Sequence, residues 1–532
     1  MPRALLRIQR AVTRSPLEVA LAIAAIVAAV YAIVTPFTAA RYPAMTDFPF
    51  HAAQTSTIRH WLDPSFHPQD QFEIHPLAVP YFSMYAIGAA LMFVFPVIVA
   101  VKIAAAVMLA LLPAGLAVMF HGMKKSPLLG LLGLGAVWTS LTHWGFLNFM
   151  GALGLFAMAV GFTFLLVDKP TPGRQLALGL TLVALFFTHI FRYPFALCAV
   201  VGTAIVMYPV TRRIRPIALP LIPAIALFLM WLRIRPATLA TGIGPLRVHK
   251  ERLGELVPDL MGAFVDPAEK LAFERFFSIA VVVASLCLAL RLWAHLAERE
   301  RPSARGGFTW DALALIVPLG CAAVFLGLFL VLPMEIGLWW YVYPREATAA
   351  VFLLLGAFPD LPRSILLRAP LASALASAGL GVSAVVTKNY AVFGKATDDF
   401  AAITQQIPRA PRLLYLVFDH GGSTRTTTPF IHLPAYVQAE KGGWLSFHFA
   451  TWGTLPIQYR PRDQPGAVVP PSVPLRWEWT PQAFNVAQRG AFFDWFLVRR
   501  GASPDAIFQA DPSIERVDHV GTWWLYRRRP KP

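Results

Sequence analysis

Long, nearly uninterrupted runs of apolar residues dominate the first three quarters of the chain. A helix needs roughly 20 apolar residues to cross the hydrocarbon core of a bilayer, and eleven runs approach that length. They predict transmembrane helices at 17–37, 97–121, 128–145, 149–167, 174–191, 193–210, 215–232, 277–297, 309–332, 345–360 and 368–387. The pattern therefore predicts a polytopic α-helical membrane protein with about 11 transmembrane helices.

A further apolar run, 78–95, is long enough to span but ends at Pro96 and is followed at once by another apolar run. If it spans the membrane, Lys124 and Lys125 lie outside, and every later loop lies on the opposite side of the membrane. If it lies in the membrane interface, the bases of the amino terminus and of most short loops collect on one side, as the positive-inside rule requires. We therefore predict an amphipathic helix at 78–95 on the outer leaflet, a cytoplasmic amino terminus and an external carboxyl tail.

Short alternating runs replace the long apolar ones after residue 405, where Pro, Trp and polar residues become frequent. They predict a small α/β domain with strands at 412–419, 444–450 and 492–500, a helix at 429–442 and a hairpin at 514–528 that turns at Val520-Gly521. The predicted domains are a transmembrane domain at 1–390, a linker at 391–404 and an extracytoplasmic domain at 405–532. Two further external segments are large, the loops 38–96 and 233–276.

Composition narrows the class of protein. Hydrophobic residues make up 57% of the 532 residues and charged residues 14%, which excludes a disordered chain and an ordinary soluble enzyme. The formal net charge of +17 would suggest nucleic acid in a soluble protein, but here the bases flank apolar runs, so we predict no nucleic-acid partner. Cys198, Cys287 and Cys321 lie inside apolar runs, which excludes a disulfide framework and a cysteine metal site. Abundant Arg, Ala and Pro fit a multi-pass protein of a bacterial inner membrane.

The most informative short stretch is TDFPFHAAQTSTIRHW (46–61), just beyond the first predicted span. If 48–60 is helical, as Pro49 in a first turn allows, Asp47 is its N-cap and His51 projects nearby. A plain helix cap is one interpretation of Asp47. The other is a carboxylate at the membrane face that acts as general base toward an acceptor hydroxyl or holds a divalent metal ion such as Mg or Mn.

A cytoplasmic amino terminus, one span, and then an external loop that opens on an acidic residue resemble the GT-C class of membrane glycosyltransferases. Protein mannosyltransferases and lipid A aminoarabinose transferases belong to that class. The odd span count, the trailing external domain, Lys102 at the start of the second span and GFLNF (145–149) agree with the resemblance. Asp47 matches the acidic residue of the first loop in that class.

The resemblance implies transfer of a sugar from a polyprenyl-phosphate-linked donor in the outer leaflet to a hydroxyl of a lipid, glycan or protein acceptor. Asp47 and His51 are then the candidate catalytic residues. Basic residues near the outer face are candidates for the leaving phosphate, namely Arg345 (the preferred one, within WWYVYPREA), Lys102 and Arg192. Polar residues predicted near the same cavity are His143, Asn148, His189 and Glu335. Arg345 also has a plainer interpretation as a snorkelling anchor at a span end.

The chain also departs from the class, in which many members carry a second acidic residue in the next external loop. Here that loop, THWGFLNF (142–149), has His143 and Asn148 but no carboxylate. Either a histidine substitutes, the metal is dispensable, or the chain is a non-catalytic relative. Two other functions stay open, a transporter or flippase of lipid-linked saccharides and a membrane scaffold that binds partners through its tail. Against a transporter, the two halves show no internal repeat.

Overall fold

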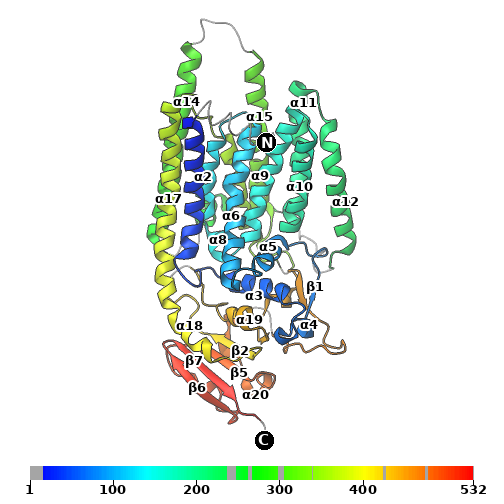
Figure 1. Ribbon diagram of the computed structural model, residues 1–532, viewed down its shortest axis with the longest axis vertical. Helices are drawn as coiled ribbons and strands as arrows, with labels where there is room; N and C mark the ends of the chain where they lie inside the picture. Colours follow the sequence, from blue (N-terminus) through cyan, green and yellow to red (C-terminus); the bar gives the residue numbers. More distant parts are fainter. Residues whose placement is uncertain are drawn as a thin grey trace.

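Long helices stand side by side in one half of the molecule, and short helices and strands gather at the end where the chain terminates (Figure 1). The computed structural model describes residues 16–236, 247–261, 266–297, 305–337, 339–422, 427–473 and 477–530. The basic amino-terminal residues used for the orientation, and parts of the predicted loop 233–276, lie outside the described residues. The structure therefore consists of a helical body with a smaller mixed domain at one end.

Eight helices within the described residues are long and apolar enough to cross a membrane. They are α2 (Pro16–Thr38), α6 (Val97–Gly122), α9 (Leu147–Asp168), α11 (Tyr193–Thr211), α12 (Ala218–Ile234), α14 (Pro267–Ala297), α15 (Arg305–Val331) and α17 (Ile365–Ala396). Each contains one of the predicted spans or most of it. The chain is therefore a polytopic helical membrane protein, while the count of eleven spans stays a prediction.

Three predicted spans are shorter in the structure. The run 174–191 forms α10 (Pro172–Thr188), and 345–360 forms α16 (Val342–Leu354) followed by the turn η8 (Leu355–Ala357). The continuous helix predicted at 128–145 is wrong, because this segment breaks into η2 (Pro127–Gly133), α7 (Leu134–Val137) and α8 (Ser140–Trp144). Gly130 and Gly133 approach Pro113 so closely that a Cβ would meet its backbone at 2.6 and 2.7 Å, and this close packing accompanies the irregular backbone.

Glycines also allow α6 and α9 to pack closely along most of their length. A Cβ on Gly115 would collide with the backbone of Gly154, and one on Gly122 would collide with that of Gly161. Each helix thus presents two glycines seven residues apart to its partner. Small residues let backbones approach where apolar side chains gain nothing by leaving lipid, so this glycine contact fixes the centre of the helical body.

The loop 38–96, the predicted first external loop, contains α3 (Phe48–Arg59), η1 (Pro64–Phe66), α4 (Pro68–Gln71), β1 (Phe72–Ile74) and α5 (Ser83–Leu91). The helix predicted at 48–60 is therefore confirmed. The side of the membrane on which the loop lies stays a prediction. At about 1.5 Å per residue, the nine residues of α5 cover about 14 Å, less than half of a bilayer core. The run 78–95 is not a spanning helix, as predicted, and its location on the outer leaflet stays a prediction.

The tail forms a five-stranded sheet in the order β3-β2-β5-β7-β6. Its strands are β2 (Arg412–Val417), β3 (Trp444–Leu445), β5 (Trp495–Arg499), β6 (Ile514–Val520) and β7 (Trp523–Arg528). β2 is parallel to β3 and β5, and the predicted hairpin is the antiparallel pair of β6 and β7. Remaining elements of the tail are α19 (Ala435–Lys441), η11 (Trp477–Trp479), η12 (Pro481–Ala483), α20 (Val486–Arg489) and η13 (Asp505–Ile507).

Two predictions for the tail need correction. The strand at 444–450 is only two residues long, because the His448 imidazole accepts a hydrogen bond from the Ala450 N–H at 2.9 Å and starts the turn η10 (Phe449–Trp452). The predicted linker 391–404 is helical, since it comprises the end of α17 and α18 (Asp398–Ile403), followed by η9 (Thr404–Gln406). The tail therefore continues from the last long helix through helical turns.

The first external loop and the tail form one packed unit. β1 pairs antiparallel with β4 (Ile457–Tyr459), and α3 packs on α19. Phe50 of α3 is fully buried and lies 4.3 Å, between ring centroids, from Phe449 of the tail and 4.8 Å from His432. Segments almost 400 residues apart in the chain thus share one apolar core, next to the ends of the helices (Figure 1).

We expect Phe50→Ala to destabilise this unit by about 3 to 5 kcal/mol, because deletion of a fully buried ring leaves a cavity. The measurement is thermal or denaturant unfolding of the purified protein, together with the rate of proteolysis of the tail. Leu62→Ala is the matched control in the same loop, since Leu62 is 85% exposed and should change stability by less than about 0.5 kcal/mol. Equal losses in the two variants would contradict the packing described here.

Candidate functional site

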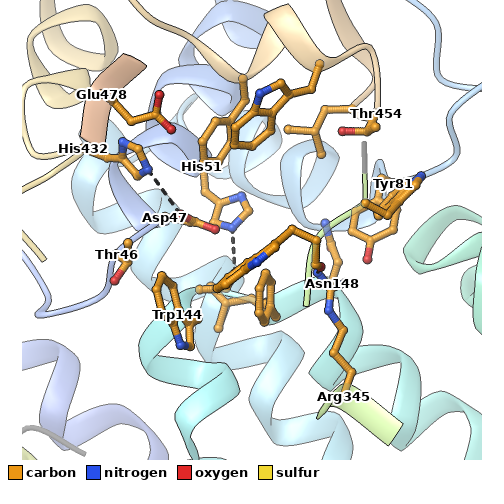
Figure 2. Close-up of a pocket in the computed structure, with 18 of the residues that line it drawn as sticks. Thr46, Asp47, His51, Tyr81, Trp144, Asn148, Arg345, His432, Thr454 and Glu478 are labelled. Atoms are coloured by element: carbon orange, nitrogen blue, oxygen red, sulfur yellow. Dashed lines mark hydrogen bonds and ion pairs between the residues drawn. The ribbon is translucent and has the colours of Figure 1, made fainter. Parts of the chain in front are cut away.

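A cavity of about 550 Å³ lies where the first external loop, the segment 144–148, the segment before α16 and the tail meet. Figure 2 shows labelled side chains from the loop 38–96, from the segment 144–148, from α16 and from the tail around it. Eight of the 21 lining residues are Phe, Tyr or Trp, and four are Asp, Glu or Arg. The lining residues are Thr46, Asp47, His51, Tyr81, Trp144, Gly145, Phe146, Leu147, Asn148, Glu335, Gly337, Trp339, Trp340, Arg345, His432, Phe449, Trp452, Thr454, Leu455, Glu478 and Trp479. Five of the nine predicted site residues are among them, namely Asp47, His51, Asn148, Glu335 and Arg345.

Asp47 lies at the start of α3 but does not cap it. Its side chain makes no hydrogen bond to the first turn of the helix, so the plain cap interpretation does not describe its contacts. Its backbone is held instead, because Asp47 N–H donates to the Trp144 carbonyl at 3.1 Å and Thr46 N–H donates to the His143 carbonyl at 2.9 Å. The carboxyl is left to face the cavity beside His432 (Figure 2).

Gly145 allows this arrangement. Its φ of +100° is unfavourable for residues with a side chain, and a Cβ there would lie 2.9 Å from the Asp47 Cβ. The Gly145 carbonyl oxygen accepts a hydrogen bond from the His51 imidazole at 2.8 Å. The close approach of the two loops thus depends on a glycine at this position.

Burial changes the protonation of Asp47. Removal from water raises its pKa to about 8, with the Arg345 charge opposing and the Glu478 charge reinforcing this shift. The Asp47 side chain keeps 19% of its exposure, and its carboxylate oxygen lies 3.6 Å from the His432 Nε2. Burial also lowers the pKa of His432 to about 3. Near neutral pH the imidazole is therefore uncharged, and the proton of this pair resides mostly on the carboxyl.

His51 lines the cavity, but both of its ring nitrogens are engaged. One contacts the Tyr85 hydroxyl at 2.9 Å and the other donates to the Gly145 carbonyl. Burial lowers the pKa of His51 to about 4, so the ring is neutral, accepts from Tyr85 and donates to Gly145. His51 therefore orients the loop that faces Asp47, and it does not offer a nitrogen to a reacting group.

Arg345 is the charged group on the opposite side of the cavity from the tail (Figure 2). Its side chain is buried at 8% exposure, lies 4.0 Å over the Phe146 ring and donates from Nη2 to the Trp340 carbonyl at 2.9 Å. No carboxylate of the described residues lies within ion-pair distance of it, and its Nε has no hydrogen-bond partner there. A buried guanidinium that faces a cavity and has no ion-pair partner among the described residues is the kind of group that can bind an anion.

Asn148, at the start of α9, is a second polar group without a partner. Its side chain is 1% exposed, and neither its amide nitrogen nor its amide oxygen is hydrogen-bonded within the part of the chain that the structure describes. Such a group is costly to bury unless a water or a ligand satisfies it. Because Asn148 lines the cavity that Arg345 also lines, both point to a polar ligand at this end.

The other two predicted phosphate ligands are used elsewhere. Arg192 forms a buried bidentate ion pair with Glu346, the neighbour of Arg345 in the chain, so its charge is already neutralised. The Lys102 ammonium donates to the Ala40 carbonyl at 2.5 Å and lies in a separate cleft with Arg41 and Glu440. Neither residue lines the cavity, and we no longer expect either to bind the phosphate of a substrate there.

Two predicted histidines also lie outside the cavity lining. His143 is completely buried and forms an ion pair with Glu269 at 2.5 Å, and Glu269 also accepts from the Asn389 amide at 3.3 Å. His189 packs behind Tyr81, with 4.7 Å between ring centroids. His143 therefore acts on the site only through its backbone carbonyl, which receives the Thr46 N–H.

The tail contributes residues to the cavity that were not predicted from the sequence. His432 precedes α19, Glu478 and Trp479 belong to η11, and Trp452 ends η10, yet all of them line the cavity. The available signal was the cluster WEW (477–479), an acid between two tryptophans in a segment with neither helical nor strand periodicity. Charged and aromatic residues in a loop indicate a functional site more strongly than apolar residues in a periodic segment do.

No three His, Cys, Asp or Glu side chains are grouped as a metal ion would require, among the residues described. Asp47 offers oxygen ligands of the kind that Mg or Mn prefers, but it belongs to no such group of described residues. No family model matches the chain, and no curated protein matches it, so the assignment of a function rests on the geometry of this cavity.

The raised pKa of Asp47 predicts a specific dependence of stability on pH. Its pKa of about 8 in the folded protein lies above the value of about 3.9 in an unfolded chain, so the proton binds more tightly to the folded state. The stabilisation is complete below pH about 4 and is lost as the pH rises to about 8. We expect the melting temperature of the wild type minus that of Asp47→Asn to fall by a few degrees over this range.

The matched control is Glu515→Gln, in β6, where the carboxylate pairs with Arg527 and Arg529, which keep their charge throughout this pH range. The melting temperature of the wild type minus that of this control variant should not fall between pH 5 and pH 8. A flat difference for Asp47→Asn would show that the carboxyl is ionised in the folded protein near neutral pH. That result would contradict the desolvated site described above.

Proposed function

We propose that the protein is a membrane glycosyltransferase of the GT-C type, which transfers a sugar from a polyprenyl-phosphate carrier to a hydroxyl acceptor. The observation that supports the proposal is that one cavity is lined both by Asp47, a carboxyl just before α3, and by Arg345, a buried arginine without an ion-pair partner among the described residues. Such a transfer needs a base for the acceptor and a positive charge for the leaving phosphate. Asp47 and Arg345 supply these groups.

In the proposed reaction, the acceptor oxygen attacks the anomeric carbon of the donor sugar. The bond between that carbon and the phosphate oxygen breaks, and the polyprenyl phosphate leaves with the bonding electrons. The acceptor proton passes to ionised Asp47. Arg345 and the unpaired amide of Asn148 stabilise the negative charge on the phosphate, and attack from the opposite side inverts the anomeric centre.

We further propose that this cavity opens on the outer face of a bacterial inner membrane. The bases of the short loops, including Lys124 and Lys125, then lie in the cytoplasm. Eleven spans give this orientation if α10, α16 and the broken segment 127–144 each cross the membrane, in addition to the eight long helices. Short or irregular segments are tolerated at membrane depth when protein surrounds them, and residues 129–143 are buried without exception.

The proposal predicts large and separable effects of two substitutions on sugar transfer. We expect Asp47→Asn to lower the rate by about 10² to 10⁴-fold, as for loss of a general base. Arg345→Gln should lower it by about 10² to 10³-fold, as for loss of a charge on the leaving group. The measurement is transfer of radiolabelled sugar from polyprenyl-phosphate-linked donors in membranes that contain the purified protein.

Two control variants accompany these. Asp70→Asn alters a carboxylate of the same loop that does not line the cavity, and Lys102→Gln alters a cation of the separate cleft. Both should keep transfer within about twofold of the wild type, and the melting temperatures of all four variants report their folding. Full activity of Asp47→Asn would remove Asp47 from the mechanism and with it this assignment.

The orientation is tested by cysteine labelling from the two sides of the membrane. Cys198, Cys287 and Cys321 are first replaced by Ala, and single cysteines are then placed at Lys124 and at Asp463, both exposed. We expect a membrane-impermeant maleimide to reach position 463 in intact spheroplasts and position 124 only after lysis, because the bases mark the cytoplasmic side. Labelling of position 124 from outside would show that the orientation is the reverse of the one proposed.

A further inference from the structure

The cavity has two chemically different halves. The helical half carries Arg345 and the unpaired Asn148 amide among Tyr81, Trp144, Phe146, Trp339 and Trp340, whereas the tail half is formed by His432, Phe449, Trp452, Thr454, Leu455, Glu478 and Trp479. Asp47 lies between them, beside His432 and above the segment that contains Trp144 (Figure 2). Only the helical half favours an anion, because Arg345 is the only Arg or Lys among the described lining residues.

The tail half combines flat apolar surfaces with hydrogen-bonding groups. Trp452 stacks on Phe449, with 4.7 Å between centroids and 21° between planes. Trp479 is 36% exposed, and its ring meets His420 edge to face at 5.2 Å. Glu478 and Thr454 add oxygen atoms to the same wall. Aromatic faces are electron-rich and attract the C–H bonds on one face of a sugar ring, while oxygen acceptors suit its hydroxyl groups.

His432 provides a second, independent indication of a ligand in this half. Its side chain is 4% exposed, and its Nδ1 has no hydrogen-bond partner among the described residues. Because Nε2 faces the Asp47 carboxyl, Nδ1 is the ring nitrogen that can pair with a hydroxyl group, as acceptor or donor according to the tautomer. A buried imidazole nitrogen without a partner beside the candidate base is suited to a ligand hydroxyl.

We propose that the tail half is the acceptor subsite and that the acceptor is a neutral saccharide. Its ring lies against Trp479 and Trp452, and one hydroxyl points toward Asp47. The inference rests on the proposed function, and it narrows the acceptor from any lipid, glycan or protein hydroxyl to a sugar without charge. The absence of Arg and Lys among the described lining residues of this half disfavours acceptors that carry phosphate or carboxylate next to the reacting hydroxyl.

The test is saturation-transfer difference NMR on the full chain in lipid nanodiscs. The probes are methyl α-D-mannopyranoside, methyl β-D-glucopyranoside and methyl α-D-galactopyranoside, with glucose 6-phosphate as the anionic probe and N-acetyl-threonine amide as the peptide probe. We expect transfer to the ring protons of at least one neutral glycoside, reduced at least fivefold in Trp479→Ala and restored in Trp479→Phe. The control Trp293→Ala, at a Trp 72% exposed on α14, should leave the signal unchanged.

The outcomes separate this inference from the proposed function. If no neutral glycoside shows transfer, if Trp479→Ala leaves the signal intact, or if the phosphate or threonine probe binds more strongly, the saccharide assignment fails. That failure leaves the catalytic proposal standing as long as Asp47→Asn abolishes sugar transfer. If glycoside binding depends on Trp479 while Asp47→Asn transfers sugar at the wild-type rate, the subsite is correct and the mechanism is wrong.

Discussion

The position of Asp47 depends on two backbone hydrogen bonds between the first external loop and the segment 143–145. Thr46 and Asp47 donate to the carbonyl groups of His143 and Trp144, and these contacts free the Asp47 side chain from capping α3. The acceptor segment is itself anchored, because the His143 side chain pairs with Glu269 and both are completely buried. Removal of one partner of a buried pair costs about 3 to 5 kcal/mol, so the geometry of the cavity is tied to α14 and, through Asn389, to α17.

Much of the fold follows from apolar run length, and the parts that do not follow are those set by distant contacts. The sequence predicted the long helices, the helix after Asp47 and the tail hairpin correctly, because each reflects a local pattern. It did not predict the pairing of β1 with β4, since three-residue strands almost 400 residues apart leave no periodic signal. The break of 128–145 was missed for the same reason, because it depends on glycines packed against Pro113 of another helix.

Distant contacts also decide which of the predicted charged residues belong to the candidate site, and the sequence does not show these contacts. Asp47 and Arg345 were predicted from their places at the ends of apolar runs, and both line the cavity. Arg192 and His143 had equally good sequence positions, but their partners Glu346 and Glu269 were assigned no role from sequence. Whether a basic residue is available to a ligand depends on whether a carboxylate neutralises it, and that is a property of packing. The same holds for His432 and Glu478, which reach the cavity only because the tail packs on the first external loop.

The raised pKa of Asp47 explains how a buried carboxyl could act as the base of the proposed reaction. With a pKa of about 8, roughly one Asp47 in ten is ionised at pH 7, which looks unfavourable for proton abstraction. A carboxylate with a pKa near 4 would be fully ionised but about 10⁴-fold weaker in its affinity for the acceptor proton. General bases work best when their pKa lies near the working pH, so the loss of a factor of about ten in ionised form is outweighed. The burial that raises the pKa of Asp47 would thus also make its carboxylate a strong base in the proposed reaction, and the same burial makes ionisation of Asp47 lower the stability of the folded protein.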